Sequence, residues 1–150
     1  MARSADQSAG TRGHPNGSEF LNNRILIVED NPANRELLQD WLEIEGYEVW
    51  CAADLESSYK LFGTHLPDVV LLDINLGAEN GLDLVAWMRR NASLNNILVI
   101  AVTAHALATE QERIVRAGCV ACLSKPIDFK DLREQLQRWL QFRVVSRQHS

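Results

Sequence analysis

The amino-acid sequence predicts an α/β fold of the doubly wound type, in which helices cover both faces of a five-stranded parallel sheet. Short apolar runs rich in β-branched residues alternate along the chain with amphipathic stretches of about 10 to 14 residues. The runs are nearly continuous in apolar residues, as strands covered on both faces require. Several of them end in a polar residue, and the carboxyl ends of parallel strands form the ligand-binding edge of such sheets. These observations together favour five βα units.

The five apolar runs are the predicted strands, in chain order. Residues 25–28, 69–72 and 97–102 are the most continuously apolar, and residues 47–51 and 120–123 are the remaining two. Because short loops and right-handed crossovers connect such units, we expect the strand order 2-1-3-4-5 of a flavodoxin-like sandwich.

The helices between the strands are predicted from apolar spacing and from start and stop signals. Asn31 before Pro32 predicts a start, the capping box at residues 109–112 predicts another, and Gly46 and Gly118 predict helix ends. Four stretches carry apolar or amphipathic residues at helical spacing: Leu37, Leu38, Trp41 and Leu42; Leu55, Tyr59 and Phe62; Leu82, Val85, Ala86 and Arg89; and Leu132, Leu136, Trp139 and Leu140.

Polar side chains stand at the ends of four of the predicted strands. Glu29 and Asp30 follow the first strand, Asp73 the third, Thr103 the fourth and Lys125 the fifth. The order 2-1-3-4-5 makes the first and third strands neighbours, so the three carboxylates would meet beside the hydroxyl and the ammonium. This combination predicts a divalent-metal and phosphoryl site.

Composition limits the classes to which the chain can belong. Its 150 residues are 46% hydrophobic, enough for one core, and its net charge is −5 without a Lys/Arg run, which argues against nucleic-acid binding. The apolar runs are far shorter than the roughly 20 residues of a membrane helix. Three cysteines without a secretory signal favour a reducing compartment, so we expect a cytoplasmic protein.

The chain divides into three parts. Residues 1–21 are polar and without periodicity and predict a disordered N-terminal arm, in which residues 17–20 read like translated cloning sites. Residues 22–143 predict the folded domain, and residues 144–150 predict a flexible C-terminal tail.

Four segments of the predicted domain carry a family resemblance. They are Val-Glu-Asp-Asn at 28–31, Leu-Leu-Asp-Ile-Asn-Leu at 71–76, Val-Thr-Ala-His-Ala at 102–106 and Leu-Ser-Lys-Pro-Ile at 123–127. In this order, at these strand ends, they resemble the receiver domain of response regulators in two-component and phosphorelay signalling, a chemotaxis-regulator-like family. The last two segments look most like receivers that work with hybrid kinases and phosphorelays.

The resemblance implies a role for each strand-end residue. Asp73 would be the phosphoacceptor, with Lys125 pairing first with Asp73 and then with a phosphoryl oxygen. Mg²⁺ would be held directly by Asp30 and Asp73, through water by Glu29, and by the backbone carbonyl of Asn75.

Further residues would control the switch and the lifetime of the phosphoryl group. Thr103 would be the switch hydroxyl, and Asn75 and His105 would flank the attacking water. Pro126 is expected to follow a cis peptide bond after Lys125.

The sequence departs from the family pattern at two positions and contains one unrelated motif. Cys122 stands where the family usually has an aromatic switch residue, and Gly77 stands where a proline is common, which predicts a more flexible loop. Cys119 and Cys122 spell C-x-x-C, but the pair leads into a strand rather than opening a helix, so we interpret it as structural.

The predicted function is a phosphoacceptor, not an enzyme, that takes its phosphoryl group from a histidine kinase or a histidine phosphotransfer protein. Its output would be a protein contact, and a phosphorylation-dependent homodimer is a hypothesis from the resemblance. The chain is either a stand-alone regulator or a receiver from a larger protein. Two alternatives stay open: a pseudo-receiver that ignores phosphorylation, and a phosphatase of the haloacid dehalogenase type, which would need an acid where Asn75 stands.

Overall fold

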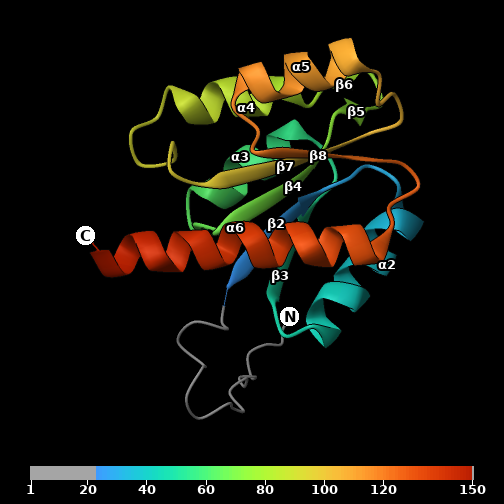
Figure 1. The fold of residues 1–150 in the computed structure, drawn as a ribbon. Helices are drawn as coiled ribbons and strands as arrows, with labels where there is room; N and C mark the ends of the chain where they lie inside the picture. The colour runs from blue at the N-terminus through green and yellow to red at the C-terminus, as the bar shows by residue number, and fades with distance from the viewer. Residues whose placement is uncertain (1–22, 150) are drawn as a thin grey trace.

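The computed structural model describes residues 23–149 and contains the predicted parallel sheet. Its five strands lie in the order β3-β2-β4-β7-β8, which is 2-1-3-4-5 when the strands are counted along the chain (Figure 1). The predicted fold class and strand order are therefore confirmed. The strands are β2 (Arg24–Val28), β3 (Glu48–Ala52), β4 (Val69–Asp73), β7 (Leu98–Thr103) and β8 (Ala121–Ser124).

Helices cover both faces of this sheet, and successive strand residues point to opposite faces. In β2, Ile25 and Ile27 pack into one apolar cluster while Leu26 and Val28 pack into the other. All four side chains are at most 1% exposed, as strands covered on both sides require. Figure 1 shows α2 (Pro32–Ile44) and α6 (Phe129–His149) on one face and α3 (Leu55–Phe62), α4 (Leu82–Arg89) and α5 (Ala108–Ala117) on the other.

The predicted start of α2 and the predicted stop signals are confirmed, but one predicted cap is wrong. Asn31 accepts a hydrogen bond from the Asn34 N–H at 3.0 Å, and Pro32 follows it as the first helical residue. Gly46 and Gly118 have φ angles of 102° and 120°, the left-handed region that ends helices. The capping box at residues 109–112 does not cap α5, because this helix already begins at Ala108.

A short hairpin that the sequence did not predict follows the central strand. Strands β5 (Asn75–Leu76) and β6 (Glu79–Asn80) pair antiparallel, and Gly77 turns the chain between them with φ 59°. The structure therefore places a paired hairpin where the sequence predicted a flexible loop.

The predicted chain ends have different outcomes. Helix α6 continues through His149, so the segment predicted as a flexible tail from residue 144 is helical to that point. The predicted disordered arm, residues 1–21, lies outside the described residues. In the described part of the chain, no helix combines the length and apolarity needed to span a membrane.

Candidate functional site

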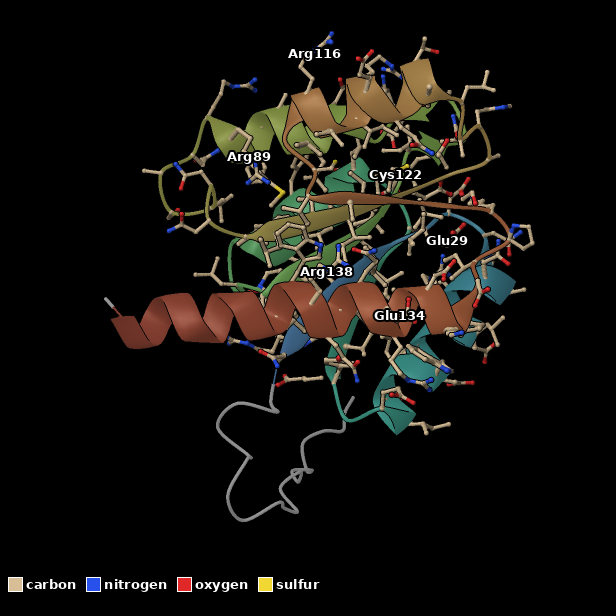
Figure 2. The ribbon with its side chains drawn as sticks, viewed as in Figure 1. Glu29, Arg89, Arg116, Cys122, Glu134 and Arg138 are labelled. Carbon is tan, nitrogen blue, oxygen red and sulfur yellow. The ribbon has the colours of Figure 1, made fainter. Side chains whose placement is uncertain are left out.

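Three carboxylates meet at the carboxyl edge of the sheet. One oxygen each of Glu29, Asp30 and Asp73 lies within 4.8 Å of the other two. The register of β2 on β4 pairs Val28 with Leu72, so Glu29 and Asp73, the next residue of each segment, lie side by side at this edge. Glu29 and Asp73 are only 4% and 2% exposed, whereas Asp30 is exposed, and Figure 2 shows Glu29 at this edge. The structure thus brings together the three acids that the sequence predicted.

Lys125 enters the same cluster from the end of β8. Its Nζ lies 2.8 Å from Asp73 Oδ2 and 4.0 Å from Glu29 Oε1. The peptide bond between Lys125 and Pro126 is cis, as predicted. Lys125 is therefore a cation shared by the two buried carboxylates.

The charges of this cluster do not balance. Three carboxylates and one ammonium leave two negative charges at a largely buried site. Burial raises the pKa of Glu29, the Asn31 N–H opposes this by donating to its carboxylate, and the charge of Asp73 raises the pKa further. Burial alone would lower the pKa of Lys125, but its hydrogen bond to Asp73 and the surrounding acids raise it overall. A bound cation would relieve the acids of the repulsion that Lys125 leaves uncompensated.

The donor set fits Mg²⁺. All three predicted side-chain ligands offer hard carboxylate oxygens, and a dication would match the two uncompensated negative charges. The N–H of Asn75 donates to Asp73 Oδ1 at 2.9 Å, which holds this stretch of backbone beside the Asp73 carboxylate. Ligation by the Asn75 carbonyl stays a prediction.

Thr103 lies at the end of β7, and its hydroxyl is engaged by its own loop. The side chain is 0% exposed, and its Oγ1 accepts a hydrogen bond from the His105 N–H at 3.1 Å. The predicted switch residue and the predicted lifetime residue are thus connected to each other through this loop.

The two cysteines of the C-x-x-C motif lie in apolar surroundings. Cys119 is buried, and Cys122, on β8, packs half-buried against the core beneath α3, α4 and α5 (Figure 2). Burial raises the pKa of Cys119 to about 12 and also raises that of Cys122. Both thiols are therefore protonated at neutral pH and poorly nucleophilic, in keeping with a structural interpretation.

Sequence reasoning missed three residues that shape the site. Arg35 Nη1 donates to the Glu29 carbonyl at 2.8 Å, and Glu79 Oε1 accepts from the Leu55 N–H at 3.1 Å. Gly81 packs so closely on Asp73 that a Cβ there would lie 2.5 Å from the Asp73 carbonyl oxygen. Of these three residues, only Gly81 could have been found from the sequence, as a glycine just before a helical stretch. The contacts of Arg35 and Glu79 depend on the folded arrangement.

Comparison with known proteins gives a consistent result. The family model of the response regulator receiver domain matches residues 25–137. The polar-differentiation response regulator DivK of Brucella anthropi is 38% identical over 116 residues, covering 77% of this chain and 94% of DivK, and DivK of Brucella ovis matches equally.

Solved structures agree in fold. The CheY-like response regulator receiver domain protein of Methanospirillum hungatei is 28% identical with a TM-score of 0.75, covering 83% of this chain and 98% of that one. The receiver domain of sensor histidine kinase PA1611 from Pseudomonas aeruginosa is 31% identical with a TM-score of 0.72, covering 80% and 98%. The latter structure has a magnesium ion coordinated in its active-site cleft.

Proposed function

This chain belongs to the response regulator receiver domain family, and we propose that it accepts a phosphoryl group on Asp73 from a phosphohistidine donor, with Mg²⁺, and signals through a protein contact. The observation that carries the proposal is the Asp73 carboxylate, held by Lys125 on one oxygen and grouped with two further acids. The acid two residues on that a haloacid dehalogenase would need is absent, because Asn75 stands there.

Asp73 is placed to act as the nucleophile. Its Oδ1 accepts from the Asn75 N–H and its Oδ2 from Lys125 Nζ, and each carboxylate oxygen keeps a second lone pair. In the proposed transfer, one Asp73 oxygen forms a bond to phosphorus while the bond from phosphorus to the donor imidazole nitrogen breaks. The electron pair of that bond returns to the imidazole. The product is an acyl phosphate on Asp73.

Charge compensation is the main task of the surrounding residues. Lys125 would move its hydrogen bond from Asp73 Oδ2 to a phosphoryl oxygen, which keeps a donor on the developing negative charge. Glu29, Asp30 and Asp73 would hold Mg²⁺, which when bound neutralises charge on the carboxylates and on the phosphoryl oxygens. The magnesium site of the related PA1611 receiver supports this assignment.

Phosphorylation would be read out as a change of surface. We propose that the Thr103 hydroxyl leaves the His105 N–H for a phosphoryl oxygen and moves the loop that leads into α5. The output face would include α5, β8 with Cys122, and α6, and would contact a protein partner or a second copy of the chain. The donor would be a histidine kinase or a histidine phosphotransfer protein in the cytoplasm. The chemistry would stop at self-catalysed transfer and dephosphorylation, so the domain would not be an enzyme.

The test is the intact mass of the protein after incubation with acetyl phosphate and Mg²⁺. We expect a gain of about 80 Da, the mass of one phosphoryl group, that is lost with EDTA and in Asp73→Asn. Mass gain in Asp73→Asn would contradict the assignment of the acceptor. If no mass is gained, Mg²⁺-dependent binding of beryllofluoride separates a short-lived phosphoryl group from a pseudo-receiver, which would bind none.

A further inference from the structure

We propose that Glu79 is a positioning residue, which holds the β5–β6 hairpin against α3 and thereby keeps Asn75 in place beside the phosphoacceptor. The inference rests on the proposed function, because its consequence is the affinity of the acidic cluster for Mg²⁺. It assigns a role to an exposed side chain outside the predicted site residues.

The hairpin connects directly to the site at both its base and its tip. At the base, the Asn75 N–H donates to Asp73 Oδ1 at 2.9 Å. At the tip, a Cβ on Gly77 would lie 3.7 Å from Asp30 Oδ2, so the turn runs close to the exposed acid of the cluster. A shift of the hairpin would therefore change the surroundings of two of the three carboxylates, those of Asp73 and Asp30.

The strand pairing of the hairpin is too limited to hold its position alone, and Leu76 is its one residue buried in the core. Each of its strands has two residues, and pairing is limited to Asn75 with Asn80 and Leu76 with Glu79. An isolated two-stranded hairpin is at best marginally stable in water even when it is longer. Gly77 at the turn adds backbone freedom, where the family pattern commonly has a proline.

Three hydrogen bonds at β6 and the residue after it restrain the hairpin. They differ in how far apart in the sequence their partners lie. The Gly81 N–H donates to the Ile74 carbonyl at 2.7 Å, and Asn80 Oδ1 accepts from the Leu82 N–H at 2.9 Å. Both bonds are local to the segment. The third, from the Leu55 N–H to Glu79 Oε1 at 3.1 Å, spans 24 residues and is the one of the three that reaches α3.

The hydrogen bond from the Leu55 N–H to Glu79 also stabilises the start of α3. The first N–H groups of a helix have no partner within the helix, and a negative charge near them is favourable. Asp54 caps the Ser57 N–H at 2.8 Å, and Glu79 accepts from the Leu55 N–H. The Glu79 contact thus joins the hairpin to α3, whereas the Asp54 contact lies within the start of α3 itself.

The experiment uses calorimetry to compare Mg²⁺ binding by the 150-residue chain and by three variants of it. Glu79→Ala removes the acceptor, and we expect the Kd for Mg²⁺ to rise about threefold to tenfold, the range of a lost capping bond. Glu79→Gln removes the charge but keeps a carbonyl oxygen, so its Kd should stay within about twofold. Asp54→Ala weakens the same end of α3 without touching the hairpin and should also stay within about twofold.

Three results would overturn the proposal. An unchanged Kd in Glu79→Ala would show that the contact is not coupled to the metal site. A rise in Asp54→Ala as large as that in Glu79→Ala would assign the effect to the stability of α3. A loss in Glu79→Gln equal to that in Glu79→Ala would assign it to charge alone.

A second readout separates this inference from the proposed function. If the wild-type protein binds no Mg²⁺, the proposed function fails, and hydrogen exchange of the Asn75 amide without metal decides the role of Glu79. Faster exchange in Glu79→Ala than in Glu79→Gln and Asp54→Ala supports the positioning role. Equal exchange in all three variants rejects it.

Discussion

In the proposed function, the Thr103 side chain would take part in the readout of phosphorylation but not in the uptake of the phosphoryl group. Its buried hydroxyl accepts from the His105 N–H, whereas Asp73 is held by Lys125 and by the Asn75 N–H. These contacts of the Thr103 hydroxyl and the Asp73 carboxylate share no residue, and Thr103 is joined to Lys125 only through the backbone, where the Lys125 N–H donates to the Thr103 carbonyl at 2.9 Å. Uptake of the phosphoryl group should therefore not require the hydroxyl, while the response of the loop before α5 should.

We therefore expect Thr103→Ala to gain the same mass as wild type with acetyl phosphate and Mg²⁺. The change in hydrogen exchange of α5 on adding beryllofluoride should be lost, because the hydroxyl that would follow the ligand is gone. Thr103→Ser keeps the hydroxyl and should retain the response. A full α5 response in Thr103→Ala would show that another group moves this helix.

Gly81 makes a second residue-scale prediction. A Cβ at this position would lie 2.5 Å from the Asp73 carbonyl oxygen and 3.0 Å from the Ile74 Cα, and neither backbone atom can yield without moving Asp73. Gly81→Ala should lower the free energy of unfolding by about 1–3 kcal/mol, as overpacking does, and weaken Mg²⁺ binding.

The matched control is Gly46→Ala, measured by urea unfolding and Mg²⁺ calorimetry. Gly46 has φ 102° and no atom within 4 Å of its Cβ position. Alanine there should cost about 1–2 kcal/mol through the left-handed backbone alone, with the Mg²⁺ affinity unchanged. Equal effects of both variants on Mg²⁺ binding would mean that lost stability, not the close approach to Asp73, weakens the site.

At the scale of elements, a cluster at the ends of α2 and α6 joins these two helices. The Trp41 and Phe129 rings lie 4.9 Å apart, and the Arg133 guanidinium stands 5.3 Å from the Trp41 ring centroid. Arg133 also donates to Glu45 at 3.0 and 3.3 Å. The cluster fixes the first helix after the acidic pair to the last helix of the proposed output face.

The ion pair in this cluster predicts a pH dependence. The hydrogen bond from Arg133 lowers the pKa of Glu45 below its usual 4.5. Because the folded pKa is the lower one, the pair stabilises the fold above about pH 4.5, and this contribution is lost as the pH falls through the lowered pKa.

Glu45→Gln should therefore be less stable than wild type at about pH 7, and this difference should become smaller toward about pH 3. Urea unfolding at the two pH values measures this. A difference of the same size at both would assign the effect to packing rather than to charge.

Elements could be predicted from the sequence where local pattern and tertiary burial agree. The five strands of the sheet coincide with the five predicted apolar runs, whose predicted ends are within one residue of the observed ones. The β5–β6 hairpin has strands too short for any periodicity, so contacts beyond the local sequence define it. The capping box failed because Leu107 precedes the first residue of α5, which puts Thr109 inside the helix.

At the scale of the molecule, the site could be predicted because the strand order brings its residues to one edge of the sheet. Parallel strands in the order found bring Glu29, Asp73 and Lys125 to one edge, although 52 residues separate the last two. The Glu79 contact could not be predicted, since a glutamate in a polar loop has many alternative partners and only the folded arrangement selects the Leu55 N–H.

If Mg²⁺ binds at this edge as proposed, it should stabilise the whole molecule. A ligand that binds only the folded state stabilises it by mass action, by about 2.7 kcal/mol at a concentration one hundred times its Kd. We expect Mg²⁺ to raise the free energy of unfolding of wild type by about this amount, and EDTA to remove the gain.

The source of this gain can be located with two variants that lose one negative charge each. Asp30→Asn removes the exposed ligand of the cluster, and Asp40→Asn removes an exposed carboxylate from α2. If the uncompensated acids bind the cation, the Mg²⁺ dependence of unfolding should be strongly reduced in Asp30→Asn and kept in Asp40→Asn. Equal losses in both would instead point to general screening of the negatively charged surface, and the buried cluster would then not be the source of the stabilisation.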